Sequence, residues 1–159
     1  MKVAIYPGSF DPITKGHLDV LKTGAEIFDK VIIAVTKNSY KKCFLTVEQR
    51  VELIKKTIEE EKLKNVEVDS FEGLTVEYAK KKGAKVLLRG LRAVSDFEYE
   101  MQLSQTNSSL SENIKTIFLT TRPKYNFISS STVRDIKLLG GDVSKFVPAS
   151  VNEYLKIVK

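Results

Sequence analysis

Cysteine, histidine and long apolar runs are scarce in this 159-residue sequence. Its single cysteine, Cys43, excludes an internal disulfide framework and cannot build a cysteine-based metal site alone. The longest apolar run, Val31 to Val35, is far too short to cross a bilayer. The residues after Met1 lack the apolar stretch and cleavage site of a signal peptide. We therefore expect a cytoplasmic protein with no membrane partner.

Positive charge exceeds negative charge, but it is not gathered into one tract. The formal net charge of +6 admits nucleic acid, an anionic membrane or small polyanions as partners. The basic residues are scattered over several segments, among them Lys41–Lys42, Lys80–Lys82 and Arg89–Arg92. No RNP-like motif with interleaved aromatic residues is present. This distribution favours a small ligand rich in phosphate and argues against a nucleic-acid partner.

Short β-branched runs alternate with segments of helical periodicity along almost the whole sequence. The strand-like runs lie at residues 2–6, 31–35, 66–68, 86–88 and 116–120. Six helices are expected between and after these strands. The first begins near His17, the second follows an N-cap at Thr46, and the third spans residues 75–82. The fourth runs from a cap at Asp96 to Leu110, the fifth follows Ser129–Ser131, and the sixth has Pro148 in its first turn. The alternation predicts one domain over residues 1–159, a Rossmann-like α/β fold whose five-stranded parallel sheet has helices on both faces. Ligands of such sheets bind beyond the carboxyl ends of the strands, so segments 7–17, 37–42, 89–92 and 121–131 should meet in one crevice.

The segment Tyr6–His17, which closes on the only histidine, has the composition of a phosphate-binding turn. It matches neither the G-x-G-x-x-G fingerprint nor the P-loop pattern. Gly8 permits close approach of the backbone, and Ser9 and Phe10 offer N–H donors in front of an expected helix start. A histidine donating a hydrogen bond there could stabilise charge that develops on a phosphate. The alternative is that His17 only caps or packs the helix.

Three further groups of residues are of types that bind oxyanions. Ser129–Ser131 precede a helix and offer hydroxyl and N–H donors, with Arg134 about one turn later, although serines there are also ordinary N-caps. Arg89 and Arg92 follow an apolar strand and can present planar forks to phosphate, or they are solvated surface arginines. Lys41 or Lys42 could bring a mobile ammonium group to the negative charge of the phosphate, or these lysines could serve only solubility.

These segments together resemble the bacterial phosphopantetheine adenylyltransferases along nearly the whole chain. The matching segments are Tyr6–Pro12 (YPGSFDP), Thr14–His17 (TKGH), Arg89–Val94 (RGLRAV), Asp96–Met101 (DFEYEM), Phe127–Ser131 (FISSS) and Gly140–Val143 (GGDV). The T/H-x-G-H and I-S-S-S patterns identify the wider nucleotidyltransferase superfamily, whereas R-G-L-R-A-V-x-D-F-E-Y-E is more specific. The resemblance implies the nucleotidyltransferase fold and reversible transfer of AMP from ATP to 4′-phosphopantetheine, giving dephospho-coenzyme A and pyrophosphate.

The resemblance also implies which residues bind each substrate. Those implied for ATP are Ser9, Phe10, His17, Gly90, Leu91, Arg92, Glu100, Tyr125, Asn126, Phe127, Ile128, Ser129, Ser130 and Ser131. Those implied for the acceptor are Ser9, Lys41, Thr75 and Arg89. Lys41 rather than Lys42 aligns with the substrate lysine of the family. Two positions depart from the family: Thr75 stands where an aliphatic residue is common, and Cys43 where proline is common.

The expected mechanism needs no general base, because the acceptor phosphate is already an anionic nucleophile at neutral pH. Catalysis then rests on holding two polyanions in line, a task for which His17, Lys41 and Arg92 are suited. We expect Mg²⁺ to be held largely by ATP. The resemblance further implies a homohexamer and feedback inhibition by coenzyme A. The alternatives are a nucleotidyltransferase acting on another small phosphate acceptor, and a nucleotide- or nucleic-acid-binding domain without catalysis.

Overall fold

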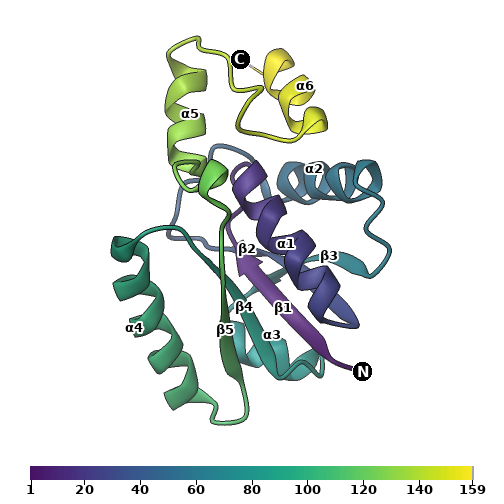
Figure 1. Cartoon of the computed structure of the whole chain (residues 1–159), viewed down its shortest axis with the longest axis vertical. Helices are drawn as coiled ribbons and strands as arrows, with labels where there is room; N and C mark the ends of the chain where they lie inside the picture. Colours follow the sequence, from purple (N-terminus) through teal and green to yellow (C-terminus); the bar gives the residue numbers. More distant parts are fainter. Residues whose placement is uncertain (159) are drawn as a thin grey trace.

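The computed structural model describes residues 1–158, apart from the side chain of Ser95. Within these residues five parallel strands form one sheet in the order β3-β2-β1-β4-β5 (Figure 1). The strands are β1 (Val3–Gly8), β2 (Lys30–Lys37), β3 (Val66–Glu72), β4 (Val86–Leu91) and β5 (Lys115–Thr120). The helices are α1 (Lys15–Ile27), α2 (Val47–Glu60), α3 (Thr75–Lys81), α4 (Val94–Leu110), the 3₁₀ turn η1 (Pro123–Tyr125), α5 (Ser130–Leu138) and α6 (Ala149–Ile157). The predicted five-stranded parallel sheet is confirmed.

Successive side chains of the central strands enter two hydrophobic cores, one on each face of the sheet. In β1, Ala4 and Tyr6 enter one core, whereas Ile5 enters the other. The first core also contains residues of α1, α2, α5 and α6, and the second contains residues of α3. Strands buried on both faces need apolar side chains at every position, which explains the continuous run in β2. The prediction of helices on both faces is therefore confirmed.

The strand order reverses at β1, because β2 and β3 lie on one side of it and β4 and β5 on the other. Loops that leave the sheet in opposite directions open a crevice at such a point. The four predicted segments do meet there. Ser9, Lys41, Arg92 and Ser129, one from each segment, line a single cavity.

Reciprocal side-chain caps define the starts of α1 and α2. The predicted capping box of α2 is present: the Thr46 hydroxyl accepts the N–H of Gln49 at 3.1 Å, and the Gln49 side chain accepts the N–H of Thr46 at 2.9 Å. α1 has the same arrangement with Thr14 as the N-cap and a histidine, His17, as the third helical residue. The helix thus begins slightly before the predicted position.

Three predicted helix starts are wrong in detail, and one of them is that of α5, which begins at Ser130 and not after Ser131. α4 begins after Ala93, and Asp96 is not its cap because the Asp96 carboxylate accepts hydrogen bonds from Arg92 instead. Pro148 is the N-cap of α6 and not a residue of its first turn. None of the helices within residues 1–158 combines the length and the apolar character that crossing a bilayer requires.

Candidate active site

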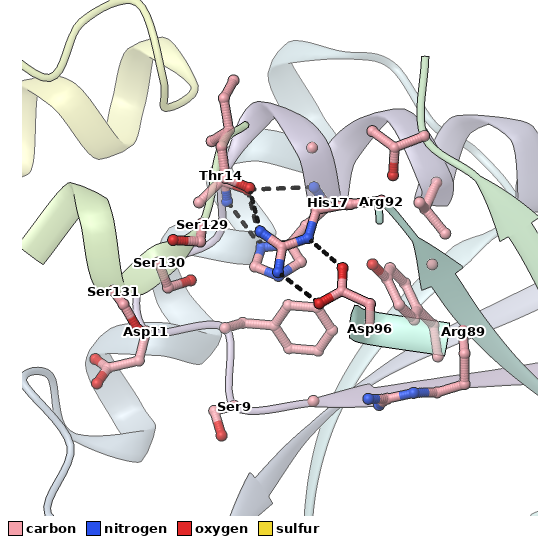
Figure 2. Close-up of a pocket in the computed structure, with 18 of the residues that line it drawn as sticks. Ser9, Asp11, Thr14, His17, Arg89, Arg92, Asp96, Ser129, Ser130 and Ser131 are labelled. Atoms are coloured by element: carbon pink, nitrogen blue, oxygen red, sulfur yellow. Dashed lines mark hydrogen bonds and ion pairs between the residues drawn. The ribbon is translucent and has the colours of Figure 1, made fainter. Parts of the chain in front are cut away.

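A cavity of about 290 Å³ opens at the carboxyl ends of β1 and β4 (Figure 2). Its walls come from the turn after β1, the start of α1, the end of β4 with the start of α4, and the start of α5. The predicted site residues that line it are Ser9, Phe10, His17, Lys41, Arg89, Gly90, Arg92, Glu100, Ile128, Ser129, Ser130 and Ser131. We call it the first cavity.

The turn after β1 is shaped by Gly8 and Phe10. Phe10 adopts φ of 47°, in the left-handed region that is costly for a side chain other than glycine. Its buried ring packs onto Gly8, where an added Cβ would lie 3.0 Å from the ring. The same ring meets Tyr6 and His17 edge to face, with centroid distances of 5.1 and 5.0 Å. Burial of the Phe10 ring therefore holds the strained turn against the first cavity.

His17 takes part in the cap of α1 through one of its two ring nitrogens. The backbone N–H of Thr14 donates to His17 Nδ1 at 3.0 Å, and the Thr14 hydroxyl accepts the N–H of His17 at 3.3 Å. An Nδ1 that accepts a hydrogen bond carries no proton, so in the neutral ring the proton is on Nε2. Burial, with the charges of Arg92 and Arg89, lowers the pKa of His17 to about 3. His17 is therefore a neutral Nε2–H donor in the wall of the cavity.

Arg89 is braced by a bidentate ion pair with Glu100. Its Nε donates to Oε2 at 2.8 Å and its Nη2 to Oε1 at 2.6 Å, while Nη1 donates to the Pro7 carbonyl at 2.8 Å. Glu100 is only 7% exposed. Arg89 is thus half-buried and held in place, unlike a solvated surface arginine. Glu100, implied by resemblance to bind ATP, orients Arg89 in this structure.

Arg92 connects the start of α4 to the segment before α5. Its Nε donates to the Asp96 carboxylate at 3.0 Å, and its Nη1 donates to the Ile128 carbonyl at 2.7 Å. Asp96 lies in the first turn of α4, where the helix dipole also favours a carboxylate. A guanidinium has five N–H groups, so Arg92 retains donors for an incoming phosphate.

The three serines before and within α5 use their hydroxyls inside the protein. The Ser129 hydroxyl caps the helix by accepting a backbone N–H at 3.1 Å, so the N-cap interpretation is correct for this residue. Ser130 donates to the Pro12 carbonyl at 2.8 Å, and Ser131 accepts from Arg134 at 3.2 Å. Arg134 is therefore directed into the protein framework. The donors that this helix start can offer to an anion are chiefly backbone N–H groups of its first turn.

A second cavity, of about 370 Å³, shares a wall with the first. The residues that line both are Pro7, Gly8, Ser9, Lys41, Arg89 and Glu100. The four residues implied for the acceptor, Ser9, Lys41, Thr75 and Arg89, all line the second cavity. The Lys41 ammonium donates to the Ser9 hydroxyl at 3.3 Å. Lys42, although described, lines neither of these two cavities.

Four residues implied for ATP do not line the first cavity. Leu91 is the last residue of β4, and Tyr125 is the last residue of η1. Tyr125 lines a neighbouring cavity, and the centroid of its ring lies 5.4 Å from Cζ of the Arg122 guanidinium. Asn126 and Phe127 are exposed, Phe127 by 67%. The chain between β5 and α5 therefore flanks the cavity and reaches its wall at residue 128.

Known proteins similar to this chain share its length and much of its sequence. Residues 5–136 match the cytidylyltransferase-like family model. The chain is 54% identical over 151 residues to the phosphopantetheine adenylyltransferase of Lachnoclostridium phytofermentans, covering 95% of this chain and 91% of that protein. It is 52% identical over 155 residues to the phosphopantetheine adenylyltransferase of Caldanaerobacter subterraneus subsp. tengcongensis, covering 98% and 96%. The chain belongs to the phosphopantetheine adenylyltransferase family.

Structural similarity extends beyond the phosphopantetheine adenylyltransferases. A crystal structure from Vibrio parahaemolyticus, provisionally named a nicotinate-nucleotide adenylyltransferase, matches with a TM-score of 0.72 over 98% of this chain and 99% of that one. At 20% identity, that likeness concerns the fold alone. The predicted family, the nucleotidyltransferase fold and the enzyme class are confirmed.

Sequence reasoning gave no role to two buried charged residues beside the turn after β1 of this adenylyltransferase. Asp11 and Arg50 are 2% and 3% exposed, and Arg50 donates to the Ser9 carbonyl at 2.7 Å. Arg50 had a detectable signal, because it falls three residues after Val47 and four before Ile54, on the apolar stripe of α2. A lone aspartate in a turn gives no comparable signal, so the role of Asp11 required the structure.

Proposed function

We propose that this chain transfers AMP from ATP to 4′-phosphopantetheine, giving dephospho-coenzyme A and pyrophosphate. The observation that carries the proposal is a pair of cavities with a common wall that includes Ser9, Lys41 and Arg89. The first cavity has the starts of α1, α4 and α5 in its wall and suits the phosphates of a nucleotide. The second is reached by Lys41 and suits a phosphorylated acceptor. Substrates bound in both would bring their phosphates together near Ser9.

The transfer is a direct displacement at the α-phosphorus. The acceptor phosphate is ionised at neutral pH and attacks without a general base, and pyrophosphate leaves on the opposite side. His17 donates its Nε2–H to an oxygen on which negative charge increases. Because the ring is neutral, it acts as a hydrogen-bond donor at the positive end of the α1 dipole. Lys41 and Arg92 supply the full positive charges.

The remaining residues position the two substrates. Ser9 and Phe10 meet the phosphates through the strained turn, and Thr75 and Arg89 meet the acceptor from the second cavity. The nucleotide contacts are assigned to the lining residues Gly90, Arg92, Glu100, Ile128, Ser129, Ser130 and Ser131. Leu91, Tyr125, Asn126 and Phe127 flank the nucleotide and are given no direct contact.

Mg²⁺ enters the reaction as part of the substrate, bound to the phosphates of ATP. Within the described residues, no group of three or more histidine, cysteine, aspartate or glutamate side chains is placed to hold a metal ion. The protein adds positive charge beside the phosphates through Lys41 and Arg92, while the charge of Arg89 is paired with Glu100.

The test is pyrophosphate release with ATP and Mg²⁺ in the presence of 4′-phosphopantetheine, nicotinamide mononucleotide or glycerol 3-phosphate. Only 4′-phosphopantetheine is expected to support rapid release, with dephospho-coenzyme A as the product. Release with a different acceptor would overturn the proposed substrate but retain nucleotidyl transfer. Binding of ATP without release for any acceptor would indicate a nucleotide-binding protein without this activity.

Three further properties are proposed from the family resemblance. The chain assembles as a homohexamer, coenzyme A inhibits it by feedback, and it works in the cytoplasm, where ATP is available. Light scattering is expected to give the mass of six 17.9 kDa chains. A monomer mass, or turnover that does not respond to coenzyme A, would contradict the first or the second property respectively.

A further inference from the structure

The segment of residues 38–46, between β2 and α2, carries Lys41 but has no helix or strand of its own. We call it the lysine segment. Tyr40 in it is 99% exposed, and the backbone of Lys41 bonds only locally, to the Asn38 carbonyl at 3.2 Å. The Lys41 ammonium nevertheless lies 3.3 Å from the Ser9 hydroxyl, at the wall between the two cavities. Because a lysine side chain has large rotamer entropy, such placement requires a backbone fixed from outside the segment.

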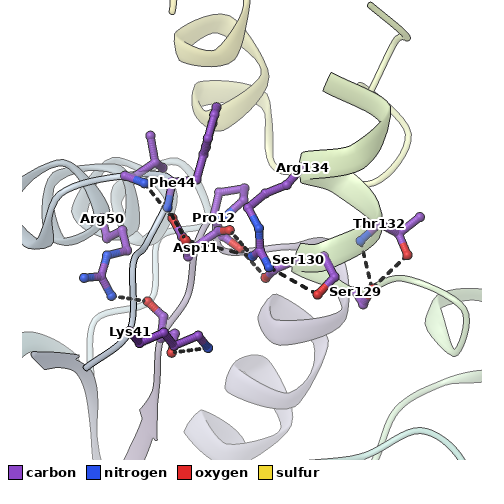
Figure 3. Close-up of polar contacts among 12 residues, drawn as sticks. Asp11, Pro12, Lys41, Phe44, Arg50, Ser129, Ser130, Thr132 and Arg134 are labelled. Atoms are coloured by element: carbon purple, nitrogen blue, oxygen red, sulfur yellow. Dashed lines mark hydrogen bonds and ion pairs between the residues drawn. The ribbon is translucent and has the colours of Figure 1, made fainter. Parts of the chain in front are cut away.

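The outside support is the carboxylate of Asp11 (Figure 3). Its Oδ2 accepts the N–H of Phe44 at 2.7 Å, and its Oδ1 accepts the N–H of Leu45 at 2.8 Å. Asp11 and Leu45 are each 2% exposed, so the bond to Leu45 is shielded from water, and the bond to Phe44 is partly shielded. Hydrogen bonds to an ionised acceptor are roughly twice as strong as neutral ones. The carboxylate therefore fixes the backbone beginning three residues after Lys41.

Asp11 is in turn held from α5. Nη1 of Arg134 donates to the Asp11 carbonyl at 2.7 Å and lies 3.9 Å from its carboxylate, while Nη2 donates to the Ser131 hydroxyl at 3.2 Å. Arg50 of α2 holds the same turn through the Ser9 carbonyl. One continuous set of contacts thus joins the start of α5, on the first cavity, to the lysine segment, on the second.

We propose that Asp11 is a positioning residue. Its carboxylate fixes the backbone of the lysine segment so that Lys41 meets the acceptor phosphate, and Arg134 links Asp11 to α5. The inference rests on the proposed function, because it assigns Lys41 to the acceptor. Although Asp11 borders the first cavity, its carboxylate points away from His17 and is engaged by Phe44 and the next residue (Figures 2 and 3). Its effect on turnover therefore passes through Lys41.

A double-mutant cycle tests this dependence, with Asp11→Asn made in the wild-type and in the Lys41→Met background. Asparagine keeps the shape but replaces one acceptor oxygen with an NH₂ group, which cannot accept an N–H. We expect kcat to fall about 10- to 100-fold in the wild-type background. In the Lys41→Met background the further loss is expected to be less than about twofold, because the ammonium is already gone. Equal losses in both backgrounds, or no loss in the wild type, would overturn the proposal.

A second readout does not depend on turnover. Cys43, the only cysteine, is half-buried beside Phe44, so its rate of modification by Ellman's reagent reports how firmly the lysine segment is held. Asp11→Asn is expected to raise this rate at least about threefold. Glu52→Gln, an equal charge change at an exposed position of α2, is the control and should change neither the rate nor turnover. An unchanged rate in folded Asp11→Asn would contradict the anchoring.

The two measurements separate this proposal from the proposed function. If the wild type releases no pyrophosphate with 4′-phosphopantetheine, the proposed function fails, whereas the Cys43 rate still decides whether Asp11 holds the segment. If Asp11→Asn loses cooperative unfolding, Arg134→Lys takes its place in both measurements, since it loosens Asp11 while keeping the charge. The same directions are then expected, and unchanged turnover and labelling would overturn the proposal.

Discussion

At the scale of single residues, the proposed chemistry depends on the two ring nitrogens of His17. Nδ1 accepts from the Thr14 backbone and closes the cap of α1, which leaves the proton on Nε2. The two interpretations of this residue from sequence, a cap and a phosphate donor, are therefore compatible. A conventional capping box has glutamate or glutamine at this position, which suggests a substitution that separates the two roles.

His17→Gln is predicted to retain the cap but lose most of the activity. The glutamine carbonyl can accept the Thr14 N–H, so the midpoint of unfolding should stay close to that of the wild type. Its amide reaches the reacting phosphate poorly, and loss of one oriented donor typically costs about 10²- to 10³-fold in kcat. Steady-state turnover and thermal unfolding measure the two effects. Activity near that of the wild type would reduce His17 to a cap.

The low pKa of His17 predicts a specific dependence of stability on pH. The imidazole titrates near 6.5 in the unfolded chain and near 3 in the folded one, so between these values the unfolded state binds the extra proton. Its stabilising effect is fully present above pH 6.5 and declines as the pH falls, by up to about 1.4 kcal/mol per pH unit. Glutamine does not titrate, so in denaturant experiments the wild type and His17→Gln should unfold with similar free energies above pH 6.5 and diverge as the pH falls towards 3, with the wild type becoming the less stable of the two. A constant difference between them would contradict the lowered pKa.

At the scale of elements, α1, which carries His17 in its first turn, packs closely against β4. Gly90 of β4 permits this approach: a Cβ added there would lie 2.8 Å from a Cγ of Val20 in α1. Gly24 of α1 lies similarly close to Leu88 of β4. The β-branched side chain of Val20 has few rotamers in a helix, so rotating it would not make room for a Cβ at position 90.

Gly90→Ala is predicted to destabilise the fold by about 1 to 3 kcal/mol through this overpacking. The effect should be relieved when Val20 is also shortened. The double variant Gly90→Ala with Val20→Ala should then lose less free energy of unfolding than the two single variants together, by at least about 0.5 kcal/mol. Denaturant unfolding of the four proteins gives this coupling. If the two losses of unfolding free energy simply added, Gly90 would not be needed for the contact between α1 and β4.

At the scale of the whole molecule, the sequence was sufficient for the sheet but not for its interior polar contacts. Alternating strand and helix signals predicted the parallel sheet, and its topology then brought Ser9, Lys41, Arg92 and Ser129 to one crevice. Side-chain partners could not be predicted, because they depend on contacts between distant segments. Asp96, for example, holds Arg92 and does not cap α4.

The division of the crevice into two cavities also depends on the arrangement of the whole molecule. It arises because the turn after β1 lies between the starts of α1 and α5 and the space bordered by α3 and α4. Two substrates on either side of that turn can react with each other directly. No step in such a transfer requires AMP to be attached to Ser9, His17 or Lys41, although all three line the first cavity.

The stereochemistry at the α-phosphorus tests this central claim most directly. ATP made chiral at that phosphorus is converted with 4′-phosphopantetheine, and the configuration of the dephospho-coenzyme A product is determined. A single in-line displacement between the two cavities predicts inversion of configuration. Retention would contradict it, because retention requires two displacements and an AMP group carried in between by the protein.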